Sequence, residues 1–265
     1  MPSQTELLQE LTTLLDAQDS LPSPTEGPYK AWVDRKSQWR PAGYAPQSIP
    51  KPPSLTHRAI EKCLALALEL EVPVGLYALE ASKREFTPDQ RWALLDNASD
   101  EINHYNALSN WERSYTPGIP PAYLTEARAI RDTLQAIPEH EILKAGYVEL
   151  GIFFVVLSIL RKFGGTSLKT LSADISRDEA QHVLVNWAVI DDQAIPYSTS
   201  VLNRFRRDVI AWLTSDIKSR DLGQPFWLEQ SDRLIATRKA DGLAFTQHGL
   251  YMSFFEISNK TMASY

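Results

Sequence analysis

Apolar residues recur at helical spacing along most of the chain. In the stretch 54–83, one helical face carries Leu64, Ala67, Leu68, Val74, Gly75 and Ala78. Comparable patterns predict helices over 3–17, 54–83, 88–114, 121–136, 138–163, 167–190, 198–219, 226–240 and 243–260. None of the chain alternates in the way a half-buried strand does. The fold class predicted is therefore all-α.

Local signals fix where the long helices begin and end. Thr87 precedes Pro88, and Gln90 follows three residues after Thr87, which is a capping box with proline at the first helical position. Gly164 and Gly165 separate the third long helix from the fourth. Because both connections are short, the four long helices should form two antiparallel hairpins.

The N-terminal part of the chain differs from the rest. Residues 21–53 are rich in proline and include Trp32, Trp39 and Tyr44, so we expect an irregular arm that its aromatic side chains hold against the helical body. The predicted organisation is an N-terminal helix and arm over 1–53 and a helical domain over 54–265. Within that domain, a bundle spans 54–190 and accessory helices span 198–260.

Composition narrows the classes of function. The 265 residues are 43% hydrophobic and 23% charged, as in ordinary soluble proteins, and the net charge of −6 argues against binding to nucleic acid or an anionic membrane. Cys63 is the lone cysteine, which excludes cysteine metal clusters and fits a reducing compartment. Residues 1–10 do not read as a secretion signal, and the longest apolar run, 150–160, is too short to span a bilayer. We therefore expect a cytoplasmic protein.

A chemically distinctive motif occurs twice. Asp-Glu-x-x-His is written at residues 100–104 and again at 178–182, and each motif glutamate follows another glutamate by thirty residues. The candidate ligands are Glu71, Glu101, His104, Glu149, Glu179 and His182. Glutamate and histidine three residues apart share a helix face and can bind one ion.

The spacing predicts that all six side chains meet. Glu71 lies 16 residues before the turn near Thr87, and Glu101 lies 14 after it, so in an antiparallel hairpin both sit at nearly one height. Glu149 and Glu179 repeat these offsets about Gly165. Buried carboxylates on apolar faces need compensating cations, and divalent metals supply them. Glu69 is the rival ligand on the first helix, but its face, shared with Lys62 and Glu80, suits solvent better.

The types of atom in the six candidate ligands indicate which metal they would bind. Oxygen-rich ligands with one imidazole per ion favour iron or manganese over zinc, and six side chains for two ions leave positions open for oxygen or substrate. Asp100 and Asp178 each adjoin a ligand glutamate. We expect each of them to accept a hydrogen bond from the histidine of the other hairpin.

These residues carry a resemblance to a known superfamily. Residues 54–190 resemble the ferritin-like diiron-carboxylate proteins, in which two helices give a glutamate each and two give Glu-x-x-His. The resemblance implies a four-helix bundle around two iron ions that react with dioxygen. The additional C-terminal helices look more like the ribonucleotide-reductase small-subunit and oxygenase branches than ferritin. Leu108 occupies the position of the reductase's radical tyrosine, which argues against that activity.

The function expected is a non-haem diiron oxidase or oxygenase. It would use dioxygen and an external electron donor to hydroxylate, desaturate or N-oxygenate a small organic or carrier-bound substrate. The alternative is a ferroxidase, a metal-handling protein or a bundle that the metals only stabilise. The aromatic residues of the arm and the C-terminal helices make a homodimer plausible.

Overall fold

The structure is a computed structural model that describes residues 2–18, 21–34, 36, 54–84, 86–115, 118–195 and 199–216, without the side chains of 54–57 and 199. These residues are helical and include no strand, which confirms the all-α prediction. The helices expected at 226–240 and 243–260 lie outside the described residues, as do Trp39 and Tyr44.

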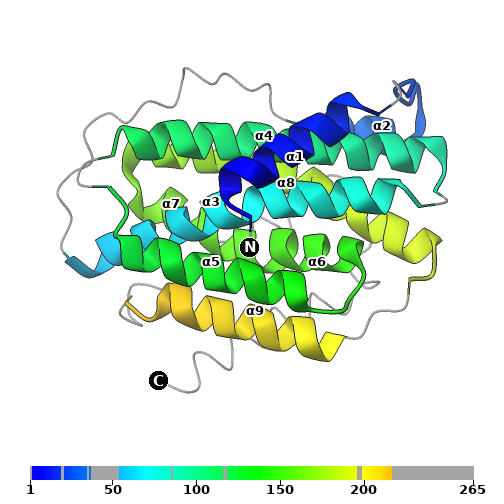
Figure 1. Ribbon diagram of the computed structural model, residues 1–265. Coiled ribbons are helices and arrows are strands. Elements are labelled where there is room, and N and C mark those ends of the chain that lie inside the picture. The colour runs from blue at the N-terminus through cyan, green and yellow to red at the C-terminus, as the bar shows by residue number, and fades with distance from the viewer. Residues whose placement is uncertain are drawn as a thin grey trace.

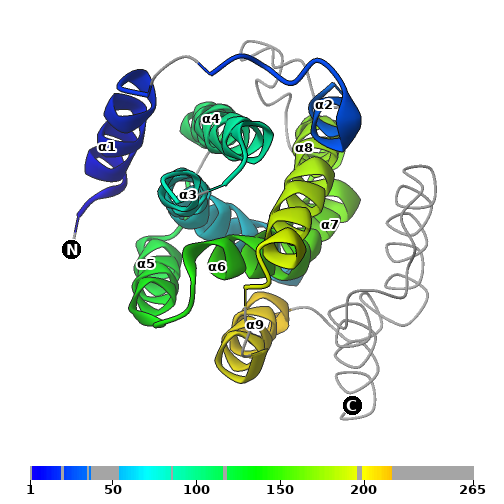
Figure 2. The same ribbon diagram turned by 90° about the vertical axis from the view of Figure 1, so that its right-hand side faces the viewer.

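Four long helical segments surround a common core (Figures 1 and 2). They are α3 (Ser54–Ser82), α4 (Pro88–Arg113), the continuous run α6 (Glu141–Tyr147), η2 (Val148–Phe153) and α7 (Phe154–Phe163), and α8 (Gly165–Asp192). α3 packs on α4, and α7 packs on α8. The two hairpins meet where α3 contacts α6 and α7 and where α4 contacts α8. Each motif helix, α4 or α8, therefore faces both the other motif helix and a helix that carries a single glutamate.

The ends of these helices follow local signals. The Thr87 hydroxyl accepts a hydrogen bond from the Gln90 amide, and the Gln90 side chain accepts one from the Thr87 amide, so the predicted capping box is present. Gly165 takes a positive φ of 74°, a left-handed conformation that glycine adopts without a steric penalty. The short connections hold both hairpins in the expected antiparallel arrangement.

The third segment departs from the prediction of a regular helix over 138–163. Its helix begins at Glu141, where the His140 side chain caps it by accepting from the Ile142 amide, and its centre is a π-helical turn around Glu149. Next to Glu149, a Cβ on Gly151 would lie 2.3 Å from Cδ of Arg206. Glycine at this position therefore lets Arg206 of α9 pass close to the turn.

Proline interrupts the hydrogen-bond ladder of α3. Pro73 lacks the amide that would donate to the carbonyl of Glu69. Gln4, at the start of α1 (Gln4–Asp16), donates to that carbonyl instead, at 2.8 Å. α1 packs across α3 and α4, so it satisfies a buried acceptor that the proline leaves open.

The proline-rich arm contains a short helix that the sequence analysis did not predict. α2 (Gly27–Val33) tolerates Pro28 because the proline lies in its first turn, where the missing amide does no harm. Tyr29 and Trp32, three residues apart, are both buried and turn one face of α2 inward. α2 packs on both α4 and α8 (Figure 2). The expectation that proline excludes helix from the arm was wrong for these residues.

Two further helices cover the outside of the bundle. α5 (Pro121–Ala136) packs on α3, and α9 (Thr199–Thr214) contacts α3, α6 and η2 (Figure 1). Within the described residues, one helical span, 141–163, has the length and apolar composition to cross a membrane. Almost all of it is buried inside the bundle, as in the core helix of a soluble protein.

Candidate metal centre

Six side chains from four helical segments converge inside the bundle. α3 provides Glu71 and η2 provides Glu149, while α4 and α8 each provide a glutamate and a histidine: Glu101 with His104, and Glu179 with His182. All six are buried, with Glu179 the most accessible at 5%. The structure thus brings together every residue in the candidate ligand set, at the common level that the helix arithmetic predicted.

The six residues form two overlapping groups. One consists of Glu71, Glu101, His104 and Glu179, and the other consists of Glu101, Glu149, Glu179 and His182. Within each group, one ligand atom per residue lies within 4.8 Å of all the others, so each group could hold a metal ion. Glu101 and Glu179 belong to both groups, and each has one oxygen near Nδ1 of His104 and the other near Nδ1 of His182.

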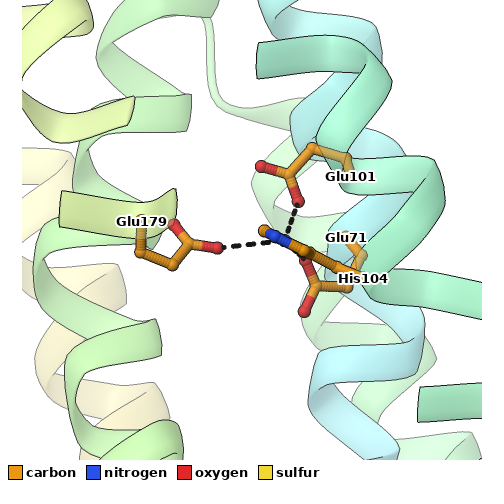
Figure 3. Close-up of side chains that lie close together, drawn as sticks. All are labelled: Glu71, Glu101, His104 and Glu179. Carbon is orange, nitrogen blue, oxygen red and sulfur yellow. Dashed lines mark hydrogen bonds and ion pairs between the residues drawn. The ribbon is translucent and has the colours of Figure 1, made fainter. Parts of the chain in front are cut away.

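In the first group, the carboxylates surround one nitrogen of an imidazole (Figure 3). Nδ1 of His104 lies 3.3 Å from an oxygen of Glu71, 3.3 Å from one of Glu101 and 3.5 Å from one of Glu179. Figure 3 shows Glu179 reaching across from α8 toward the residues of α3 and α4. The three carboxylates and this nitrogen therefore face one small volume.

The second group repeats the arrangement around His182. Its Nδ1 lies 3.0 Å from Oε1 of Glu101 and 3.9 Å from oxygens of both Glu149 and Glu179. Oε2 of Glu149 accepts a hydrogen bond of 2.5 Å from the side-chain amide of Asn186, which fixes the direction of that carboxylate. The two imidazole rings lie 5.7 Å apart between centroids and are stacked across the centre.

The other nitrogen of each imidazole contacts an aspartate from the opposite hairpin. Nε2 of His104 lies 3.3 Å from Asp178, and Nε2 of His182 lies 3.3 Å from Asp100. This is the crossed pairing expected from the sequence. A carboxylate behind a histidine fixes the ring orientation and makes the remaining nitrogen a better metal ligand. In both rings that remaining nitrogen is the Nδ1 turned toward the glutamates.

The close packing of acidic groups shifts their pKa values in opposite directions. Burial, reinforced by the charge of Glu101, raises the pKa of Glu71 well above its usual range. Burial also raises the pKa of Glu149, against the influence of His182. Burial would raise the pKa of Glu101 as well, but the two neighbouring imidazoles outweigh it and lower that pKa. Burial lowers the pKa of His182, but its contacts with Asp100 and Glu101 raise it to about 10. The raised pKa values of Glu71 and Glu149 show that the surrounding side chains do not fully offset the cost of burying these two carboxylates.

Several buried ligand atoms at this centre make no hydrogen bond. They are Oε1 of Glu71, Glu101 and Glu149, both carboxylate oxygens of Glu179, and Nδ1 of His182. Although Nδ1 of His182 and Oε1 of Glu101 are only 3.0 Å apart, they are not aligned as donor and acceptor. A buried polar atom without a partner costs about 1–3 kcal/mol, and a buried charge costs more. A pair of divalent cations would satisfy these atoms together and balance the four glutamate charges, so the residues fit a dinuclear metal site.

Glu69 is excluded from this centre by its own partners. Its carboxylate lies 2.8 Å from the guanidinium of Arg131, which is fully buried on α5, and it also accepts from Gln4. The expectation that Glu69 faces solvent was wrong, because it is only 4% exposed. The preference for Glu71 over Glu69 as the candidate ligand on α3 agrees with the structure. Glu71 belongs to the first group of candidate ligands, whereas Glu69 forms an ion pair with Arg131 outside the centre.

The glycines near the ligands serve helix packing. A Cβ on Gly75 would lie 2.7 Å from Leu11 and 3.1 Å from Cβ of Glu101, so glycine lets α1 and α4 approach α3. Gly146 lies against the ring of Trp187 on α8. Close packing thus requires glycine at position 75, whereas a Cβ at position 146 would meet Trp187 at an ordinary contact distance of 3.7 Å.

Sequence reasoning missed two polar residues at the site. Asn186, which contacts Glu149, lies four residues after His182 and so on the same helix face, a signal that was available. Lys36 contacts Asp100 and lies far from the motifs in sequence, so no spacing could identify it.

Comparison with known proteins adds no identification. No protein-family model, no curated protein and no solved structure matches this chain. The functional assignment therefore depends on the geometry of the centre itself.

Proposed function

We propose that the protein is a non-haem diiron oxidase or oxygenase of the ferritin-like kind. The observation that carries the proposal is the pair of overlapping groups, each with one histidine and three glutamates, that share Glu101 and Glu179. Two glutamates from single-ligand helices and two Glu-x-x-His helices are the ligand pattern of ferritin-like diiron proteins. The order of the four helical segments around the centre also supports this assignment.

Each residue has a separate role in this proposal. Glu71 and His104 would complete the first ion position, and Glu149 and His182 the second, while Glu101 and Glu179 would bridge the two. A carboxylate-rich site with one imidazole per ion favours iron, with manganese as the alternative. When bound, two such ions would supply the redox chemistry that reduces dioxygen and oxidises an organic substrate, with electrons from an external donor.

The protein's own contribution is orientation, charge and exclusion of water. Asp100 and Asp178 hold the imidazoles by their Nε2 atoms, so that the Nδ1 atoms stay directed at the ion positions. Asn186 holds Glu149 in one orientation. Apolar side chains of all four segments pack around the buried ligands, and electrostatic interactions in such low-dielectric surroundings are stronger than in water. The substrate and the branch of the superfamily stay predictions, as does cytoplasmic location.

Metal analysis followed by reaction with dioxygen tests the proposal. We expect purified protein to bind about two iron ions per chain, as the two overlapping groups imply. After anaerobic reduction, mixing with oxygenated buffer in a stopped-flow instrument should change the visible absorbance and consume dioxygen. The same experiment on Glu179→Ala, which lacks one shared ligand, should show neither effect. Iron that stays reduced in air in the wild-type protein would contradict an oxidase or oxygenase.

The products separate the proposal from its alternative. A ferroxidase should oxidise several added Fe²⁺ ions per chain and release or store them, with no organic substrate. An oxidase or oxygenase should retain its two ions through turnover and consume further dioxygen only with a reductant present. Multiple-turnover oxidation of free Fe²⁺ would favour metal handling.

A further inference from the structure

A buried lysine lies directly behind one of the two histidines. Lys36 follows α2, and its side chain is 7% exposed. Its ammonium group lies 2.5 Å from Asp96 and 2.9 Å from Asp100, and it donates to the side-chain oxygen of Asn97 at 2.8 Å. All three acceptors belong to α4, so Lys36 links the described end of the arm to that helix.

One oxygen of Asp100 connects this cation to the candidate metal centre. The same Oδ2 atom that contacts Lys36 lies 3.3 Å from Nε2 of His182. The side chain of Asp100 therefore lies between the ammonium group of Lys36 and the ring that carries a candidate ligand nitrogen.

Lys36 has two possible effects on an ion held by His182, and they have opposite signs. As a positive charge it repels the ion and draws electron density from Asp100, which weakens binding. As a hydrogen-bond donor it steadies Asp100, which strengthens binding. We expect the charge effect to be the larger one, because the contact with Nε2 of His182 also holds Asp100. At an effective dielectric constant of about 20, a unit charge about 10 Å from a divalent ion changes the affinity for that ion by roughly two orders of magnitude.

We propose that Lys36 lowers the affinity of the His182 position for its metal ion, acting through Asp100, and so makes the two ion positions unequal. This inference rests on the proposed metal centre. It assigns a role in metal loading to a residue of the N-terminal arm, outside the four-helix core.

The test is a titration of metal-free full-length protein with Co²⁺. Calorimetry and visible absorbance monitor the binding. Each position is isolated by removing the other: Glu71→Ala leaves the His182 position, and Glu149→Ala leaves the His104 position. In the Glu71→Ala background, Lys36→Met and Lys36→Gln should both tighten Co²⁺ binding, by roughly two orders of magnitude at an effective dielectric constant of about 20. In the Glu149→Ala background the change should be smaller. Lys36→Arg retains the positive charge and should bind Co²⁺ with the same affinity as the protein that has Lys36.

A matched control separates charge from anchoring of the arm. Asp96→Asn breaks the other ion pair of Lys36 but removes a negative charge, so it should weaken Co²⁺ binding or leave it unchanged. If loosening of the arm were the cause, Asp96→Asn would tighten binding as Lys36→Met does. Circular dichroism on every variant checks that the helices are retained.

Three results would overturn the inference. The first is Co²⁺ affinity that Lys36→Met lowers or leaves unchanged in the Glu71→Ala background. The second is Co²⁺ affinity that Lys36→Gln leaves unchanged in the same background. The third is equal tightening in both backgrounds. If wild-type protein binds no Co²⁺, the metal centre itself fails, whereas two bound ions with no effect of Lys36 would refute this inference alone.

Discussion

The two helical hairpins carry the same candidate ligands in the same register but differ in what surrounds them. An offset of 78 residues relates Glu71 to Glu149, Glu101 to Glu179 and His104 to His182. The same offset relates the aspartates that contact the imidazoles, and it places Pro73 opposite Gly151. Both single-glutamate helices thus have an irregularity at their ligand: Pro73 lies two residues after Glu71 in α3, and the π turn η2 contains Glu149.

The surroundings do not follow the repeat. Leu108 of the first hairpin corresponds to Asn186 of the second, which holds Glu149. The first hairpin has a buried ion pair, Glu69 with Arg131, where the second has Tyr147 in place of the glutamate. The comparison teaches that a shared ligand set fixes where the ions would sit, while the neighbouring residues decide how tightly each is held. The following predictions test that division, from the largest expected effect on bound metal to the smallest.

Removing a shared glutamate should have the largest effect. Glu101→Ala or Glu179→Ala takes a ligand from both ion positions, so metal content should fall from about two ions per chain to nearly none. Glu71→Ala or Glu149→Ala removes a ligand from one position and should leave about one ion. Elemental analysis after gel filtration measures the content. Equal losses from Glu71→Ala and Glu101→Ala would show that the glutamates are not shared.

Removing the charge of an aspartate that contacts an imidazole should have the next largest effect on metal binding. Asp178→Asn and Asp100→Asn leave all six candidate ligands in place but weaken the orientation of one histidine each. We expect the affinity of one ion to fall by about 10–100-fold in either variant. Titration of the metal-free proteins measures both affinities. Loss of both ions in either variant would mean that the aspartates act on the fold and not on single positions.

A smaller effect is expected at the position where the hairpins differ. Asn186→Leu introduces the residue of the first hairpin and removes the hydrogen bond to Glu149, so the affinity of that ion should fall by about tenfold. Leu108→Met is the matched control, since it conserves volume at the corresponding site. It should leave both affinities unchanged. If Asn186→Leu binds two ions as tightly as wild type, the hydrogen bond to Glu149 has no role in loading.

Glu69→Gln should leave metal content at the wild-type level. It breaks the pair with Arg131, whose buried guanidinium keeps Asp132 as its other partner, so the free energy of unfolding should fall by about 1–3 kcal/mol. Urea unfolding measures the stability, and elemental analysis measures the metal. Glu71→Gln, two residues away, should do the reverse and lose an ion. Metal loss in a well-folded Glu69→Gln protein would indicate that Glu69 is a metal ligand.

Local sequence signals were enough for much of the fold and for the convergence of the site. The start of α4 was predictable because Thr87, Pro88 and Gln90 form a cap among themselves. The common level of Glu71 and Glu101 was predictable because helix rise and a short turn determine it. These features depend on residues that are close in the chain or related by regular geometry.

Features that depend on distant contacts were not predictable. The π turn around Glu149 lies where Gly151 meets Arg206 of α9, and Glu69 finds its partner Arg131 on α5. The short helix α2 forms because Tyr29 and Trp32 bury themselves against the bundle, which outweighs the proline content of the arm. In each case the deciding partner lies in another element, and one sequence gives no signal for it.

The central claim is that the six converging side chains hold two metal ions. An anomalous difference map, recorded at the iron absorption edge from crystals of the iron-loaded protein, tests it directly. The map should contain two peaks, one among Glu71, His104 and the shared glutamates and one among Glu149, His182 and the same shared glutamates. A map with no peak at the centre, or with iron only at surface carboxylates, would contradict the claim.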